Sequence, residues 1–239
     1  ITGRAERFSS IRRMGGLSGF LKRSESPYDT FGAGHASTAM SAALGMAMAR
    51  DHRGENFQVV SITGDGAMSG GICFEALNNA GHLKPDILMI LNDNEMSISR
   101  NVGALSSTFN RILTNHFYNE KHQELVDLIR RLPAGSLLAS LSRKFEESVK
   151  GFIVPGTLFE ELGIRYLGPL DGHNLDELIP ILQKVRTLNG PILLHLITKK
   201  GKGRPYAEKD PIRFHSPPSN FDADSGKAPA KESGAPSYS

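Results

Sequence analysis

The sequence has one cysteine, no long apolar run and no block of like charge, and each of these absences excludes a class of protein. The single cysteine, Cys73, cannot form a disulfide within the chain, which favours a reducing compartment. No stretch reaches the roughly 18 consecutive apolar residues of a membrane span, and the first residues lack the apolar core of a signal peptide. We therefore expect a cytoplasmic protein without a membrane partner.

The charges of the chain are nearly balanced, with 28 lysines and arginines against 25 acidic residues and a formal net charge of +3. We expect no nucleic-acid partner, and a phosphorylated small ligand suits this balance better. With 239 residues, of which 39% are apolar, the chain can bury a full core and has the natural size of one α/β domain. Its first residue is Ile1 rather than Met, which predicts that a further segment precedes it.

Short apolar runs alternate with helical patterns along the chain. Residues 1–30 are polar and are expected to be irregular. Expected strands, of which the first two are predicted to be buried, span residues 57–63, 87–91, 164–167 and 192–198. Expected helices span residues 39–50, 71–83, 119–131, 136–150, 155–162 and 175–188. This alternation predicts an α/β fold with a doubly wound, mostly parallel sheet and helices on both faces.

Two polar segments follow the first two expected strands, Gly64-Asp65-Gly66 after one and Asn92 to Met96 after the other. Because the carboxyl ends of parallel strands meet at one edge of a sheet, we expect these segments to lie close together. Mg²⁺ prefers hard oxygen ligands and shares them with substrate phosphates. Gly-Asp-Gly alone is a common turn, but the second segment makes the pattern specific. Together they predict a magnesium and pyrophosphate site, built from Asp65, Asn94 and a main-chain carbonyl near Met96.

Residues 32–38 lead into the helix expected over residues 39–50, and His35 lies at its amino end. This helix consists almost entirely of Ala, Met, Gly and Ser, whose small side chains allow close packing. A histidine in this position is by default a helix cap or a satisfied core residue. Cys73 falls on the apolar face of the helix expected over residues 71–83, which predicts a core residue rather than a nucleophile.

Five segments carry a resemblance to a known family and together cover nearly the whole chain. They are GAGHASTAMSAALGMA (32–47), GDGAMSGGICFEALNNAG (64–81), ILNDNEMSIS (90–99), VPGTLFEELGIRYLGPLDGHN (154–174) and KGKGRPYAEKDPIRFH (200–215). The sequence resembles the 1-deoxy-D-xylulose-5-phosphate synthase family, which consists of thiamine-diphosphate enzymes of the transketolase group. The resemblance implies the thiamine-diphosphate-binding fold, the cofactors thiamine diphosphate and Mg²⁺, and a homodimer.

The resemblance also implies roles for individual residues. The carboxylate of Asp65, the amide oxygen of Asn94 and the main-chain carbonyl of Met96 match the Mg²⁺ ligands of the family. Residues matching cofactor-contacting positions are Gly34, His35, Ala36, Gly66, Ala67, Asn94 and Arg204. His35 and His215 match histidines that face the substrate and are the candidate catalytic residues. The implied reaction condenses pyruvate with glyceraldehyde 3-phosphate, with loss of CO₂, and serves isoprenoid precursor and thiamine biosynthesis.

Three departures from the family pattern keep alternatives open. Ala36 and Ala39 replace hydroxyl-bearing residues, and Arg204 stands where the family commonly has a tyrosine that contacts the cofactor. One alternative is another thiamine-diphosphate enzyme, such as a transketolase or a 2-oxo acid dehydrogenase component, which product analysis with ketose donors would distinguish. The other is a catalytically silent binding half-protein.

We expect residues 1–215 to form the pyrophosphate-binding domain and residues 216–239 to be a linker or tail. Of these last 24 residues, 16 are Ser, Pro, Gly or Ala, a composition typical of linkers. By resemblance, a pyrimidine-binding domain would follow, carrying the glutamate that activates the cofactor. The chain by itself is then expected to hold the magnesium-diphosphate half of a site and to be inactive.

Overall fold

The computed structural model describes residues 2–96, 157–216, 222 and 225–227. It divides the chain into two compact units, which we describe separately. The sheet unit comprises His35–Thr198, and the terminal unit comprises Ile1–Gly34 with Lys199–Ser239. The helices expected over residues 119–131 and 136–150 lie outside the described residues.

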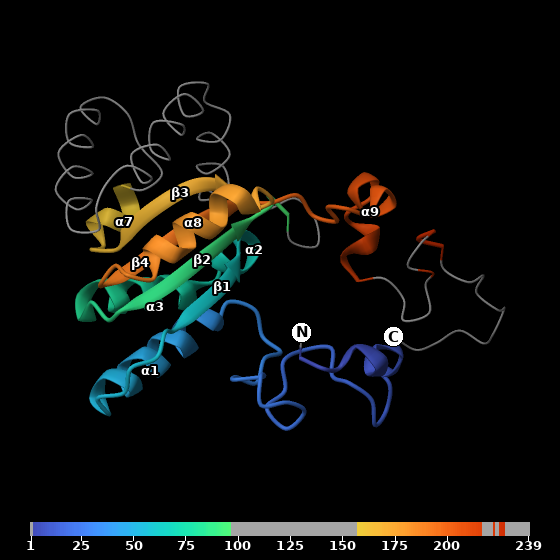
Figure 1. Ribbon diagram of the computed structural model, residues 1–239, viewed down its shortest axis with the longest axis horizontal. Coiled ribbons are helices and arrows are strands. Elements are labelled where there is room, and N and C mark those ends of the chain that lie inside the picture. The colour runs from blue at the N-terminus through green and yellow to red at the C-terminus, as the bar shows by residue number, and fades with distance from the viewer. Residues whose placement is uncertain (1, 97–156, 217–221, 223–224, 228–239) are drawn as a thin grey trace, which may run out of the picture. The chain divides into compact units, whose positions relative to one another are not determined.

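Four parallel strands form the sheet, in the order β1-β2-β4-β3, and their arrows point the same way in Figure 1. They are β1 (Val60–Gly64), β2 (Ile87–Asp93), β3 (Arg165–Asp171) and β4 (Pro191–Ile197). Parallel neighbours need crossover connections, and a helix supplies each described one. The register shifts between Leu167 and Leu170 of β3, where the Gly168–Pro169 peptide bond is cis.

Helices cover both faces of this sheet (Figure 1). On one face lie α1 (Ala39–His52) and α3 (Gly71–Leu83), which pack on the alternate β2 residues Ile87, Met89 and Leu91. On the other face lies α8 (Leu175–Val185), whose apolar stripe packs on residues of β2, β3 and β4. The shorter helices of this unit are α2 (Asp65–Met68) and α7 (Thr157–Glu161). The predicted doubly wound α/β fold with helices on both faces is confirmed.

Most predicted elements are present, with shifted ends. The α3 helix has the predicted bounds, whereas β2 runs on to Asp93 because it pairs with β4 along its whole length. The prediction that β1 is buried on both faces is wrong, since Val60 and Ile62 are 50% and 66% exposed. Among the described residues α8 packs over the other three strands and leaves this part of β1 uncovered. No helix in the described part of the chain combines the length and apolar character needed to cross a membrane.

Small residues bring α3 close to its neighbours. Ala76 and Ala80 of α3 lie in one buried cluster with Ala43 and Ala47 of α1, which confirms the predicted close packing. At the end of α3, a Cβ atom on Gly81 would collide with the main-chain carbonyl of Leu162. The backbone following α7 therefore approaches α3 more closely than any side chain would allow.

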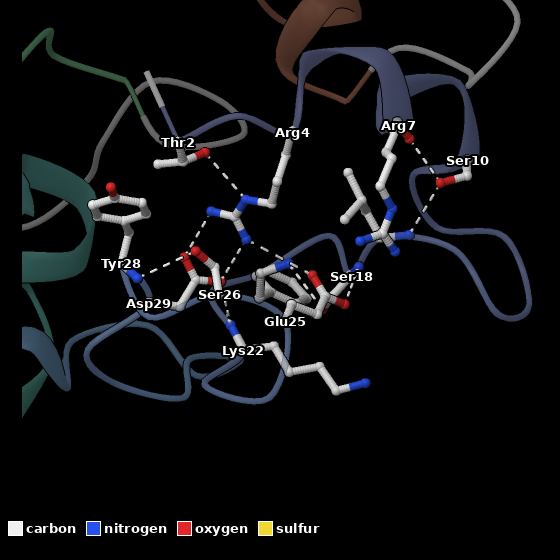
Figure 2. A network of polar contacts seen from close by, with 12 residues as sticks. Thr2, Arg4, Arg7, Ser10, Ser18, Lys22, Glu25, Ser26, Tyr28 and Asp29 are labelled. Carbon is white, nitrogen blue, oxygen red and sulfur yellow. Dashed lines mark hydrogen bonds and ion pairs between the residues drawn. The ribbon is translucent and has the colours of Figure 1, made fainter.

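The terminal unit is largely irregular, as predicted for residues 1–30, and a buried carboxylate organises its first part. Asp29 accepts two hydrogen bonds of 2.8 Å from the Arg4 guanidinium and one of 3.1 Å from the main-chain N–H of Lys22 (Figure 2). The hydrogen bond from Arg4 holds the pKa of Asp29 below its ordinary value. Glu25 lies 4.0 Å from the same guanidinium. A bidentate ion pair thus ties this segment together in place of regular secondary structure.

Three short helices in the terminal unit were not expected from the sequence. They are η1 (Ala5–Ser10), α9 (Pro205–Lys209) and η2 (Arg213–His215). Pro205 occupies the first turn of α9, a position where its missing N–H costs nothing. Helices of three to six residues are too short to show a periodic apolar pattern in a sequence.

Two glycine-to-alanine changes should have opposite effects on stability. Gly81→Ala forces a Cβ atom against a carbonyl, so we expect the free energy of unfolding to fall by about 1–3 kcal/mol. Gly45→Ala, in the exposed middle of α1 with no neighbouring atom within 4 Å, should raise it by about 0.5–1 kcal/mol. Urea unfolding of both variants checks this, and a stabilising Gly81→Ala would contradict the close approach.

Candidate cofactor and metal site

The pairing of β1 with β2 brings the two polar segments together. Gly64 lies opposite Asn92, so Asp65 and the residues after Asn92 emerge at the same carboxyl edge. The carboxylate of Asp65 accepts hydrogen bonds from the main-chain N–H groups of Gly66 and Asn94. The predicted proximity of Asp65 and Asn94 is therefore confirmed by a direct contact between the two segments.

Two carboxyl groups meet at this edge, and their pKa values are displaced in opposite directions. Burial, followed by the nearby negative charge of Asp93, raises the pKa of Asp65 from 3.8 to about 6. Burial also acts to raise the pKa of Asp93, but the hydrogen bond and electrostatic attraction of His195 outweigh it, so this pKa is lowered. Negative charge is thus concentrated where a cation would be stabilised.

The residues after β2 form a tight turn. The Oδ1 atom of Asp93 accepts the N–H of Glu95 at 3.0 Å, and Oδ1 of Asn94 accepts the N–H of Met96 at 3.1 Å. Glu95 has a φ of 59°, in the left-handed region. An amide oxygen has two lone pairs, so Asn94 can hold this turn and still ligate a cation.

The turn that precedes α1 packs against the first residues of α2. Ser37 donates its hydroxyl to the carbonyl of Ala67 at 2.6 Å, which places the segment of His35 and Ala36 beside that of Gly66 and Ala67. A Cβ atom on Gly70 would collide with the Ser37 side chain, so this close docking requires glycine. Four of the predicted site residues therefore lie on two adjoining segments, with His35 and Ala36 before α1 and Gly66 and Ala67 in α2.

Cys73 lies beneath these two segments. Its Sγ atom is 3.2 Å from the carbonyl of Ser37 and 3.4 Å from that of Ala67. Burial raises the pKa of the Cys73 thiol, which keeps it protonated and able to donate. The prediction that Cys73 is a core residue rather than a nucleophile fits this placement.

The other predicted site residues, Gly34, Arg204 and His215, belong to the terminal unit. Lys200 Nζ lies 2.7 Å from Nδ1 of His215, and because an ammonium group only donates, the ring accepts at Nδ1 and carries its proton on Nε2. Arg204 precedes α9, where its carbonyl accepts the N–H groups of Ala207 and Glu208. The joint placement of these residues with Asp65 stays a prediction.

Comparison with known proteins identifies the family. The profile of a family described as 1-deoxy-D-xylulose-5-phosphate synthase matches residues 1–198. The chain belongs to the 1-deoxy-D-xylulose-5-phosphate synthase family. It is 52% identical over 238 residues to the synthase of Pelotomaculum thermopropionicum, covering 100% of this chain and 37% of that protein. It is 54% identical over 215 residues to the synthase of Dechloromonas aromatica, covering 90% of this chain and 34% of that protein.

Among solved structures, the crystal structure of transketolase from Campylobacter jejuni is similar to this chain. The TM-score is 0.50 with 19% sequence identity, and the match covers 74% of this chain and 22% of that chain. At this identity the likeness concerns the fold alone, and it agrees with the parallel α/β sheet described above. The chain spans little more than a third of the length of the synthases that it matches.

The sequence analysis of this synthase-family chain missed a polar network behind the site. His195 of β4 lies 3.0 Å from Oδ2 of Asp93 through Nε2 and 2.7 Å from the Tyr166 hydroxyl through Nδ1. A usable pattern was present, because His195 interrupts the otherwise apolar run ILLHLI of an expected strand. A buried polar side chain in a central strand needs a hydrogen-bonding partner, so this histidine is the sequence signal for such a network.

The donor set suits a cation shared with a phosphorylated ligand. Within residues 2–96 and 157–216, no group of three or more His, Cys, Asp or Glu side chains could hold a metal ion by itself. The edge instead offers the Asp65 carboxylate, the Asn94 amide oxygen and main-chain groups. Mg²⁺ in proteins is commonly held in this way, by one or two carboxylates together with substrate phosphates.

The raised pKa of Asp65 predicts a specific dependence of stability on pH. A carboxyl group whose pKa is about 6 in the folded protein and near 3.8 in the unfolded chain binds a proton on folding. In a solution without divalent cations, protonation of Asp65 should therefore increase the free energy of unfolding as the pH falls through about 6.

Asp65→Asn removes this contribution while preserving the size of the side chain. Urea unfolding of both proteins between about pH 7 and about pH 5 measures the difference. Parallel curves for the two proteins would show that Asp65 has no raised pKa.

Proposed function

We propose that this chain forms the magnesium- and diphosphate-binding part of a 1-deoxy-D-xylulose-5-phosphate synthase. The whole protein would condense pyruvate with glyceraldehyde 3-phosphate, releasing CO₂, with thiamine diphosphate and Mg²⁺ as cofactors. Family membership supports this proposal. The observation that carries it is the convergence of Asp65 and Asn94 at the carboxyl edge of β1 and β2.

In this proposal the Asp65 carboxylate, the Asn94 amide oxygen and the Met96 carbonyl hold Mg²⁺. The backbone of Gly66 and Ala67, in the first turn of α2, contacts the diphosphate. The absence of a side chain on Gly66 lets the backbone approach the anion closely. Bound thiamine diphosphate would supply the electron sink for the carbanion chemistry, while the protein supplies positioning and electrostatics.

Further contacts are proposed for Gly34, His35 and Ala36, and for Arg204. A guanidinium at the Arg204 position suits the negative charge of a diphosphate or a phosphorylated substrate. His35 and His215 are proposed to face the substrate. Because Lys200 occupies Nδ1 of His215, the Nε2–H group can donate a hydrogen bond to a substrate oxygen.

Several expectations from the sequence remain predictions. They include the homodimer, the cytoplasmic location, and the division into a domain of residues 1–215 and a linker or tail of residues 216–239. The proposed substrates, pyruvate and glyceraldehyde 3-phosphate, belong to the whole protein, of which this chain matches little more than a third in its relatives.

Asp65→Ala should abolish magnesium-dependent binding of thiamine diphosphate. The change removes the anionic ligand of the proposed set and leaves the cation only neutral oxygens. Calorimetric titration with thiamine diphosphate in the presence of Mg²⁺ measures the effect. Asp176→Ala, which removes an exposed carboxylate from α8, is the matched control and should bind as the wild type does. Unchanged affinity in Asp65→Ala would remove the basis of the metal assignment.

In the whole protein, His35→Gln and His215→Gln should each lower turnover by roughly 10²- to 10⁴-fold, the usual contribution of a positioned acid or base. Both side chains are exposed, so the melting temperature should change little. Product formation from pyruvate and glyceraldehyde 3-phosphate is measured beside thermal unfolding. Normal turnover together with a lower melting temperature would make these histidines structural residues.

A further inference from the structure

Three polar side chains from three strands lie together inside an apolar layer. His195 of β4, Asp93 of β2 and Tyr166 of β3 are 1%, 3% and 8% exposed, on the face of the sheet that α1 and α3 cover. The imidazole bridges the other two, with 3.0 Å from Nε2 to Asp93 and 2.7 Å from Nδ1 to the Tyr166 hydroxyl. Each polar group would be costly here without its partners, so the three depend on one another.

The direction of these hydrogen bonds follows from their chemistry. An ionised carboxylate only accepts, so Nε2 of His195 carries the hydrogen that is donated to Asp93. The Tyr166 hydroxyl can donate as well as accept, and it therefore satisfies Nδ1 while orienting the ring. The Tyr166 ring is itself held by stacking on Phe159, with ring centroids 5.7 Å apart.

Asp93 connects this network to the candidate metal site. Its Oδ2 atom faces His195, its Oδ1 atom holds the N–H of Glu95, and its carboxyl group also contacts that of Asp65. The carbonyl of Asp93 accepts the N–H of Thr198 at 2.8 Å. A single side chain thus joins a rigid core network to the turn that carries Asn94 and to the carboxylate of Asp65.

We propose that His195, oriented by Tyr166, is a positioning residue for the magnesium-diphosphate site, and that it acts by fixing Asp93. Asp93 in turn fixes the 93–95 turn and the Asp65 carboxylate, so that the ligand oxygens of Asp65 and Asn94 converge before the cofactor binds. The metal-site part of this inference rests on the proposed function. The network accounts for a histidine in a strand whose other described side chains on both faces are apolar.

Variants at position 195 test the role by what they retain. His195→Leu keeps the bulk and loses both hydrogen bonds, whereas His195→Gln keeps an N–H group that can reach Asp93. Leu77→Ala is the control, because it opens a cavity on the same sheet face without removing any hydrogen bond of the network. Calorimetry measures the dissociation constant of Mg²⁺ at saturating thiamine diphosphate for the wild type and for each of the three variants.

For His195→Leu we expect Mg²⁺ binding to weaken by about 10- to 100-fold, the usual effect of removing a residue that orients a metal ligand. His195→Gln should restore most of the affinity, and Leu77→Ala should lower the melting temperature while leaving the affinity unchanged. Equal weakening in His195→Leu and Leu77→Ala, or wild-type affinity in His195→Leu, would overturn the inference. If His195→Leu does not fold, Tyr166→Phe replaces it, with weaker Mg²⁺ binding again expected.

Hydrogen exchange of the protein without cofactor gives a second, independent readout. In His195→Leu the amides of Asn94, Glu95 and Met96 should exchange faster, whereas Leu77→Ala should not single out this turn. Wild-type protein that binds no thiamine diphosphate with Mg²⁺ would overturn the proposed function, and exchange would then decide the positioning role alone. Unchanged exchange of the turn in His195→Leu would overturn that role.

Discussion

The meeting of two carboxyl groups, those of Asp65 and Asp93, is the constraint on which the site depends. Parallel pairing of β1 with β2 brings them to one edge, partly buried, where two like charges repel strongly. Main-chain N–H groups stabilise Asp65, and His195 stabilises Asp93. The remaining negative charge makes the edge favourable for a cation, and a phosphorylated ligand can then bind through that cation.

The rest of the sheet unit holds this edge in place. Small residues let α1 and α3 pack closely beneath it, and the Ser37 hydroxyl and the Cys73 thiol join the turn before α1 to the turn after β1. These contacts use main-chain carbonyls as acceptors, so they position backbone rather than individual side chains. The backbone of Gly66 and Ala67 is the part of the protein proposed to contact the diphosphate.

Family membership and site geometry support the same function by different routes. The similarity to 1-deoxy-D-xylulose-5-phosphate synthases extends over the whole chain, while the geometry concerns one edge of one sheet. The departures that the resemblance implies, at Ala36, Ala39 and Arg204, do not affect the proposed Mg²⁺ ligands Asp65, Asn94 and Met96. They leave the proposed metal-binding half of the site with all the groups that its chemistry needs.

The sequence by itself determined the type and order of the elements, and that Asp65 and Asn94 follow neighbouring strands, because periodicity and strand ends are local properties of a chain. Only the tertiary structure decided the order of the strands in the sheet. The order β1-β2-β4-β3 puts His195 beside Asp93, 102 residues away, and leaves Val60 and Ile62 exposed on an outer strand. The raised pKa of Asp65 likewise arises from burial and from the field of Asp93, and both depend on atoms that meet only after folding.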